Sequence, residues 1–63
     1  MKFKAGDLVY DPKKNEKGMI LKVFVNHNQP WYRIQMFGHI LFPIVSFEAS
    51  YAEHYLVHFE NQQ

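Results

Sequence analysis

The sequence predicts an all-β fold: a small, partly open barrel of five short strands with one short 3-10 turn before the last strand. An almost continuous apolar run over 18–25, opened by a glycine, is typical of a central strand covered on both faces. Residues 31–37 alternate between apolar and polar side chains, as a half-buried strand does. Turn-forming residues separate these runs from shorter apolar segments. A chain of 63 residues is expected to form a single domain over 1–63.

The first two strands follow from turn residues and from alternation. Residues 6–10 are expected to form a strand that ends where Asp11-Pro12 presets a turn. A polar loop then leads to the central strand over 18–25, where Lys22 marks one face as the more exposed. The side chains of this strand that we expect to face the core alternate along the chain: Leu21, Val23 and Val25.

The remaining elements are a third strand over 31–37, a fourth over 46–51, a 3-10 turn over 52–55 and a fifth strand over 56–59. Pro43 places its surroundings at an edge or in a loop. The core is expected to consist of the inward side chains of these strands, namely Val9, Leu21, Val23, Val25, Tyr32, Ile34, Met36 and Leu56.

Composition limits where the protein can work. There is no cysteine, so stability must come from packing or association, and the cytoplasm is the expected compartment. The start of the chain has no signal-peptide core, and no apolar run approaches the roughly 20 residues needed to span a bilayer. All seven Lys and Arg residues lie in the first 33 residues, together with three carboxylates, so this half has a net charge of +4. The rest of the chain has three Glu residues and a net charge of −3. Strands from the two halves are expected to be neighbours and to offset this asymmetry.

The sequence favours a protein that is not an enzyme and uses no cofactor or metal. Ser46 and Ser50 are the only serines, and no glycine-rich phosphate loop or nucleophile elbow occurs. Glu48 and Glu53 are an unconvincing acid-base pair, because so small a domain rarely forms a cleft that excludes water around both. His54 and His58 are four residues apart, but no further ligand lies at a diagnostic metal-site spacing.

Outward aromatic side chains are the main binding candidates. Alternation places Trp31, Arg33 and Phe37 on the outer side of the third strand, and Phe24 on the exposed side of the central one. The three rings could merge into one patch, with Trp31 as its anchor because tryptophan and arginine dominate interface energetics. Residues 34–47 carry no charged side chain and include Phe42, so we expect part of this stretch to be covered, most simply by a second copy of the chain in a homodimer.

The alternative candidate is a nucleic-acid site. Lys13, Lys14 and Lys17 crowd the first long loop, where they could contact phosphates without regard to base sequence. Arg33 would add a further cation, and Trp31 a stacking platform for a base. Because lysine-rich loops also serve solubility alone, a protein-binding or self-assembling module remains the first hypothesis.

Several short motifs are spread along most of the chain: Gly6-Asp7-Leu8-Val9, Gly18-x-Ile20-x-x-Val23, the tryptophan-led strand, and Leu56 preceded by a single turn. Together they resemble the SH3-like small barrels. This resemblance implies an outer surface that docks peptides or partner proteins.

Two subgroups of that family match further. Gln29-Pro30-Trp31-Tyr32 and Tyr51-Ala52-Glu53-x-x-Leu56 look like the hemimethylated-DNA-binding, heat-shock protein Q type, which implies DNA binding or a protease-adaptor role. The chain departs from that pattern in a short loop between the second and third strands and in lacking a long acidic tail. Its compact length and opening are also similar to SH3-like proteins encoded by bacteriophages, which implies a phage accessory protein acting in the host cytoplasm.

Overall fold

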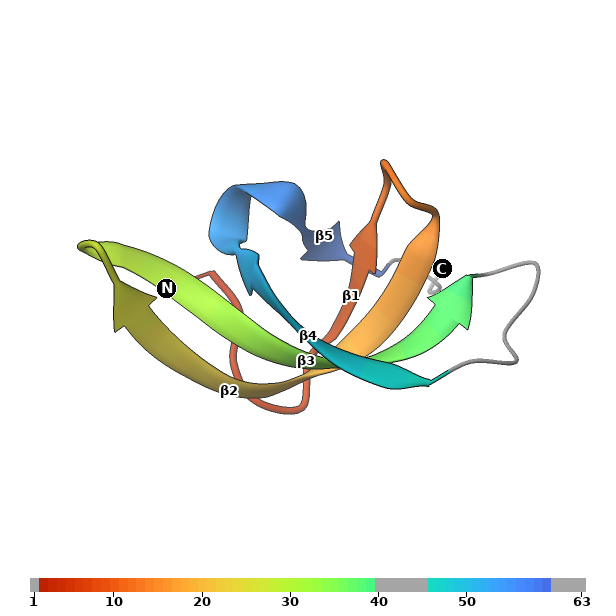
Figure 1. Ribbon diagram of the computed structural model, residues 1–63, viewed down its shortest axis with the longest axis horizontal. Coiled ribbons are helices and arrows are strands. Elements are labelled where there is room, and N and C mark those ends of the chain that lie inside the picture. Colours follow the sequence, from red (N-terminus) through yellow and green to blue (C-terminus); the bar gives the residue numbers. More distant parts are fainter. Residues whose placement is uncertain (1, 40–45, 60–63) are drawn as a thin grey trace.

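The protein is all-β, with five antiparallel strands in one sheet and a single 3-10 turn in the part of the chain that the structure describes. The computed structural model describes residues 2–39 and 46–59. Its elements are β1 (Leu8–Asp11), β2 (Glu16–Asn26), β3 (Gln29–His39), β4 (Phe47–Ala52), the 3-10 turn η1 (Glu53–Tyr55) and β5 (Val57–His58) (Figure 1). None of the described residues forms a helix long and apolar enough to cross a membrane.

The sheet has the strand order β4-β3-β2-β1-β5, so β2 is the central strand, as predicted. The long β2–β3 hairpin curves strongly, and β1, η1 and β5 lie across its concave side (Figure 1). β4 and β5 form the two edges and do not pair with each other. The predicted barrel is therefore not confirmed, because the described sheet remains open.

Two tight turns connect the first three strands. In the β1–β2 turn, the Asp11 carboxylate accepts hydrogen bonds from the backbone N–H groups of Lys13 (3.0 Å) and Lys14 (3.4 Å). The β2–β3 turn places His27 and Asn28 at φ 54° and 61°. Two successive residues with positive φ make the turn whose twist best matches antiparallel strands. This turn gives a regular pairing of β2 with β3 from Lys22 to Asn26.

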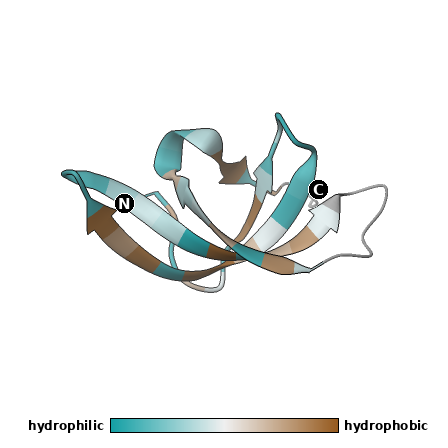
Figure 2. Ribbon diagram, viewed as in Figure 1, coloured by the Kyte–Doolittle hydropathy of each residue, from teal (hydrophilic) through white to brown (hydrophobic). Residues whose placement is uncertain are grey.

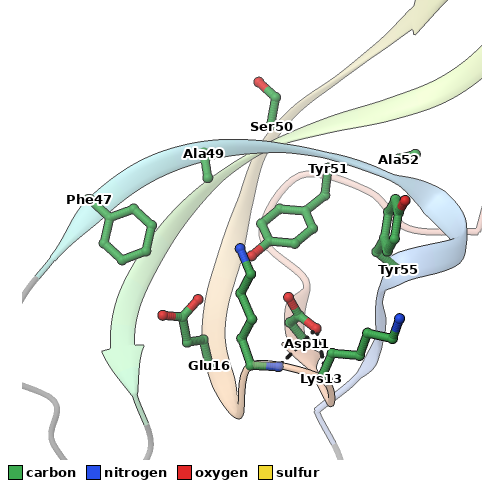
Figure 3. Close-up of a pocket in the computed structure, with 10 residues that line it drawn as sticks. Asp11, Lys13, Glu16, Phe47, Ala49, Ser50, Tyr51, Ala52 and Tyr55 are labelled. Carbon is green, nitrogen blue, oxygen red and sulfur yellow. Dashed lines mark hydrogen bonds between the residues drawn. The ribbon is translucent and has the colours of Figure 1, made fainter.

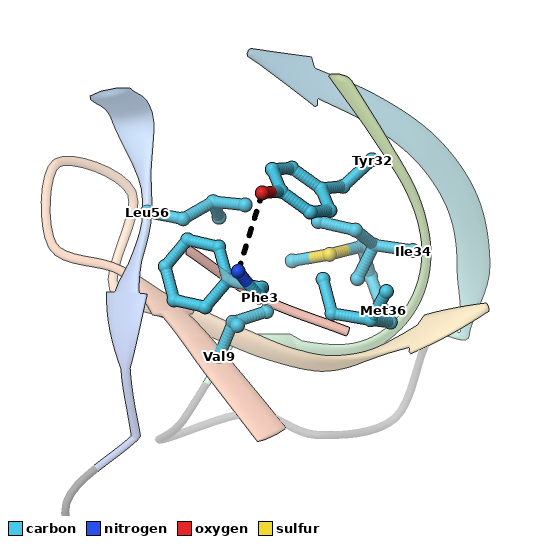
Figure 4. Close-up of a cluster of buried hydrophobic side chains, with 7 residues drawn as sticks. Phe3, Val9, Tyr32, Ile34, Met36 and Leu56 are labelled. Atoms are coloured by element: carbon cyan, nitrogen blue, oxygen red, sulfur yellow. Dashed lines mark hydrogen bonds between the residues drawn. The ribbon is translucent and has the colours of Figure 1, made fainter. Parts of the chain in front are cut away.

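The core lies on the concave face of the sheet and confirms most of the sequence prediction (Figure 4). The predicted core residues that the structure buries are Val9, Tyr32, Ile34, Met36 and Leu56. Val23 is partly buried against them. Phe3 and Ile20, which were not predicted, complete the cluster.

The predicted orientation of β2 is wrong at Leu21 and Val25, which are 41% and 62% exposed. Ile20 lies opposite Ile34, but Lys22 lies opposite Arg33, so β2 carries one extra residue between these pairs. Such a bulge shifts the alternation by one residue, which allows Ile20 and Val23 both to face the core. Val25 lies beyond the core near the β2–β3 turn, where β2 remains hydrophobic (Figure 2). β2 is therefore not covered on both faces.

A buried hydroxyl ties the N-terminal segment to β3 and η1. The Tyr32 hydroxyl donates a hydrogen bond to Glu53 Oε2 at 2.6 Å. It accepts one from the Phe3 N–H at 3.2 Å, as Figure 4 shows. Glu53 Oε2 also accepts the Lys2 N–H at 2.7 Å. Burial raises the pKa of Tyr32, while the Tyr32 hydroxyl holds the pKa of Glu53 below its usual value. Both shifts keep the phenol neutral and the carboxylate charged.

Candidate functional site

Phe24 and Trp31 lie directly opposite each other on neighbouring strands, on the face of the sheet that points away from the core. The adjacent pair, Val23 and Tyr32, points into the core, so the pleat turns both rings outward. Each ring is half-buried. Aromatic residues directly opposite each other on neighbouring strands are close enough to interact. The sequence argument proposed both residues, but only the register of β2 and β3 makes them neighbours.

A shallow depression of about 500 Å³ extends from Phe24 towards β4. We define the outer-face patch as this depression together with Trp31; its residues are Leu21, Lys22, Phe24, Trp31, Arg33, Glu48 and Ser50. Arg33 Nε donates to Glu48 Oε1 at 3.1 Å, and Arg33 Nη1 donates to Ser50 Oγ at 3.0 Å. These contacts hold the guanidinium flat against β4 and partly neutralise it. The patch therefore combines apolar rings with charges of both signs.

A second hollow, of about 380 Å³, lies between β4 and the β1–β2 turn; we call it the edge cleft (Figure 3). Phe47, Ala49 and Tyr51 point into it from β4, Tyr55 closes one end, and the opposite side comes from the β1–β2 turn. Residues of both faces of β4 line this cleft, because it extends along the free edge of the strand. Burial, aided by a hydrogen bond with Asp11, raises the pKa of Tyr51 to about 12.

The lysines proposed for nucleic-acid binding do not join Trp31 and Arg33 in one surface. Lys13 and Lys14 line the edge cleft beside two carboxylates, Asp11 and Glu16. The Lys17 ammonium lies 5.6 Å from the centre of the Phe59 ring, a cation–π contact. The three lysines therefore lie in two different hollows, both away from Trp31 and Arg33.

Phe37 is also separate from the outer-face patch. It lines a hollow of about 210 Å³ with Leu8, Lys17 and Phe59, and it lies six residues along β3 from Trp31. The predicted merging of three rings therefore reduces to the Phe24–Trp31 pair. Phe42, the remaining candidate, lies outside the described residues.

The sequence analysis singled out Lys13 and Lys14 but missed the β4 side chains that line the edge cleft with them. Phe47, Ala49 and Tyr51 alternate along β4, which is a strand signal, but their position beside the β1–β2 turn depends on the folded sheet. It also missed the structural role of Glu53, which binds Tyr32.

The histidines and acidic side chains do not gather. No group of three or more His, Asp and Glu side chains able to hold a metal ion occurs among residues 2–39 and 46–59. His58 Nε2 lies 3.5 Å from Asp7 Oδ2, and the His54 ring stacks on Tyr55.

Comparison with known proteins adds no relative: no family model, curated protein sequence or solved structure matches this chain.

Proposed function

We propose that this protein is a non-catalytic binding module that docks another protein on its outer-face patch. The observation that carries the proposal is the Phe24–Trp31 pair, two half-buried aromatic residues that lie opposite each other on β2 and β3, on the face away from the core. Binding-energy hot spots are rich in tryptophan and arginine, and Arg33 is held beside the pair by Glu48 and Ser50. A preordered guanidinium loses little side-chain freedom when a partner binds.

The charge arrangement favours a protein partner over a nucleic acid. A phosphate backbone requires several cations without nearby carboxylates, because each neutralised phosphate contributes to binding. On the outer-face patch, Arg33 already pairs with Glu48. Lys13 and Lys14 lie in the edge cleft beside Asp11 and Glu16. A partner surface with an apolar anchor and mixed charges complements such a face better than a uniform polyanion.

We further propose that the module belongs to the SH3-like class that its motifs resemble. Five antiparallel strands in one curved sheet, with the 3-10 turn directly before the last strand, support this assignment. In this proposal the concave face is the core and the convex face is the docking surface. No catalytic step is assigned to either face.

The test uses four versions of the protein to recover partners from the cells that produce it. These are the wild type, Trp31→Ala, Trp31→Phe, and the double variant Lys13→Ala/Lys14→Ala. We expect a partner protein to be retained by all except Trp31→Ala, because phenylalanine keeps a ring at the anchor. Thermal unfolding of each variant establishes that it is folded at the binding temperature. Equal retention by folded Trp31→Ala would refute the proposal.

A second arm measures the nucleic-acid alternative directly. Trp31 is the only tryptophan, so its emission reports on the outer-face patch without labelling. We expect no change in emission on titration with generic single-stranded or duplex DNA at low salt. A change at low salt that vanishes as salt rises, and that is lost in Lys13→Ala/Lys14→Ala, would instead establish phosphate-driven binding.

A further inference from the structure

Among the described residues, β4 forms an open edge of the sheet. It is six residues long, and β3 is the only strand that pairs with it in the described part of the chain. Native edges are usually blunted by charged side chains, above all lysine, by proline, by a bulge or by extreme shortness. β4 pairs with β3 in unbroken register from Phe47 to Ala52, contains neither proline nor lysine, and has Glu48 as its one charged residue. The opposite edge, β5, has only two residues and is too short to template another strand.

We propose that a second copy of this chain adds to this edge, so that the β4 strands of two copies pair antiparallel about a two-fold axis. Such an axis is perpendicular to the sheet and keeps the two inner faces on the same side. Residues that lie opposite each other must then share a face, as they do in any antiparallel pair. The possible registers are therefore centred on Glu48, on Ala49 or on Ser50.

Side-chain chemistry selects among these three registers. Centring on Glu48 places two carboxylates directly opposite each other, which is unfavourable. Centring on Ser50 leaves Phe47 without a partner on the other strand. Centring on Ala49 pairs Phe47 of each copy with Tyr51 of the other, so the dimer contains two such aromatic pairs. In this register Glu48 lies opposite Ser50 of the second copy, and no like charges meet.

The surroundings of the edge accommodate this arrangement. Phe47 is 38% exposed in the single chain, and its contact with the second copy would cover it. The edge cleft of about 380 Å³ lies on the same side as Phe47 and Tyr51, so the second copy's inner side chains have space beside them. Pairing two six-residue strands buries a small area, which implies a weak dimer that forms at high micromolar concentration. This dimer surface includes Glu48 and Ser50 of the outer-face patch but not the Phe24–Trp31 pair, and it does not depend on the proposed function.

Cysteine cross-linking tests the register, since the natural chain has no cysteine. In the register centred on Ala49, the two copies of Ala49→Cys lie directly opposite, within the range of about 4.4–6.8 Å that a disulfide spans. The two copies of Ser50→Cys are then two residues apart along the strands, so their Cα atoms are about 8 Å apart, beyond that range. With oxidised glutathione at high micromolar protein, we expect a covalent dimer of Ala49→Cys and far less of Ser50→Cys. The reverse result would overturn the proposed register.

Sedimentation over a concentration series tests the dimer in the unmodified chain. We expect the wild type to associate reversibly, and Phe47→Ser to weaken the dimer about tenfold because two cross-strand aromatic pairs are lost. Val25→Ser removes a still more exposed apolar side chain away from β4, and should leave the dimer unchanged. A wild type that remains monomeric at high micromolar concentration overturns the inference.

The same variants separate this inference from the proposed function. Trp31→Ala should dimerise normally while losing its partner protein. Phe47→Ser should keep the partner while losing the dimer. Equal weakening of the dimer by Val25→Ser and Phe47→Ser would mean that association is nonspecific, and would overturn the assignment to β4.

Discussion

Replacing Tyr32 with phenylalanine removes one oxygen atom from the centre of the hydrogen-bond network that joins the N-terminal segment, β3 and η1. The ring stays in place, since Tyr32 is fully buried and its edge packs against Phe3 with 5.2 Å between ring centres. Two hydrogen bonds disappear, one donated to Glu53 Oε2 and one accepted from the Phe3 N–H. The Phe3 residue is buried, so its N–H loses its partner without gaining water.

The expected loss is large for a protein of this size. Leaving a buried donor unpaired costs about 1–3 kcal/mol, and a hydrogen bond to a charged acceptor contributes a similar amount, although the two are not additive. We expect Tyr32→Phe to lower the free energy of unfolding by about 2–3 kcal/mol. A domain of 63 residues has a total of roughly 3–9 kcal/mol. The midpoint of thermal unfolding should fall by roughly 10–20 °C.

Urea unfolding, followed by Trp31 fluorescence and by circular dichroism, measures this loss. Tyr10→Phe is the matched control, because Tyr10 is only half-buried and its hydroxyl donates to Asn15 near the surface. A double-mutant cycle of Tyr32→Phe with Glu53→Gln isolates the coupling between the two side chains. Glu53→Gln alone should also destabilise the protein, because it removes the negative charge that the Tyr32 hydroxyl and the Lys2 N–H favour.

The pH dependence provides an independent readout of the same contact. The pKa of Glu53 is held below its ordinary value of 4.5, first by the Tyr32 hydroxyl. A lowered folded-state pKa contributes stability above the ordinary value, and this stability is lost as pH falls through the lowered pKa. Tyr32→Phe should therefore lose less stability than the wild type in acid. If Tyr32→Phe costs no more than Tyr10→Phe, and its acid profile matches the wild type, our account of this network is wrong.

Three further predictions concern β2 and the edge cleft. A Cβ at Gly18 would lie 2.6 Å from the Gln35 carbonyl oxygen, so Gly18→Ala should cost about 1–3 kcal/mol in urea unfolding. Ile20→Ala should cost about 2–5 kcal/mol and the adjacent Leu21→Ala less than about 1 kcal/mol, because the bulge buries the first and exposes the second. Because the pKa of Tyr51 is about 12 rather than 10, thermal stability should fall as pH rises from 10 to 12, and Tyr51→Phe should reduce this fall.

Each of these predictions has a result that contradicts it. A Gly18→Ala variant as stable as the wild type would mean that β2 and β3 separate more easily than their contacts indicate. Equal losses for Ile20→Ala and Leu21→Ala would place the bulge elsewhere. An unchanged alkaline profile in Tyr51→Phe would assign the loss of stability to other tyrosines, such as Tyr32, whose pKa is also raised.

The candidate site could be predicted only in part from the sequence. Alternation along β3 placed Trp31 and Arg33 on the face opposite Tyr32 and Ile34, and the structure agrees. Which cations accompany Trp31 could not be predicted, because that depends on strand pairing: Lys22 lies opposite Arg33, while Lys13 lies in the edge cleft. Residue separation along the chain does not determine separation across a sheet.

The amino-acid sequence alone determined the class of fold, the approximate position of every strand and the orientation of β3, because these depend on local alternation and turn residues. The tertiary structure decided the orientation of β2, since the bulge at Leu21 exists only in its pairing with β3. It also decided that β4 ends the sheet as an unpaired edge. The physical reason is that side-chain period is a property of one strand, whereas register, bulges and free edges are properties of two or more strands together.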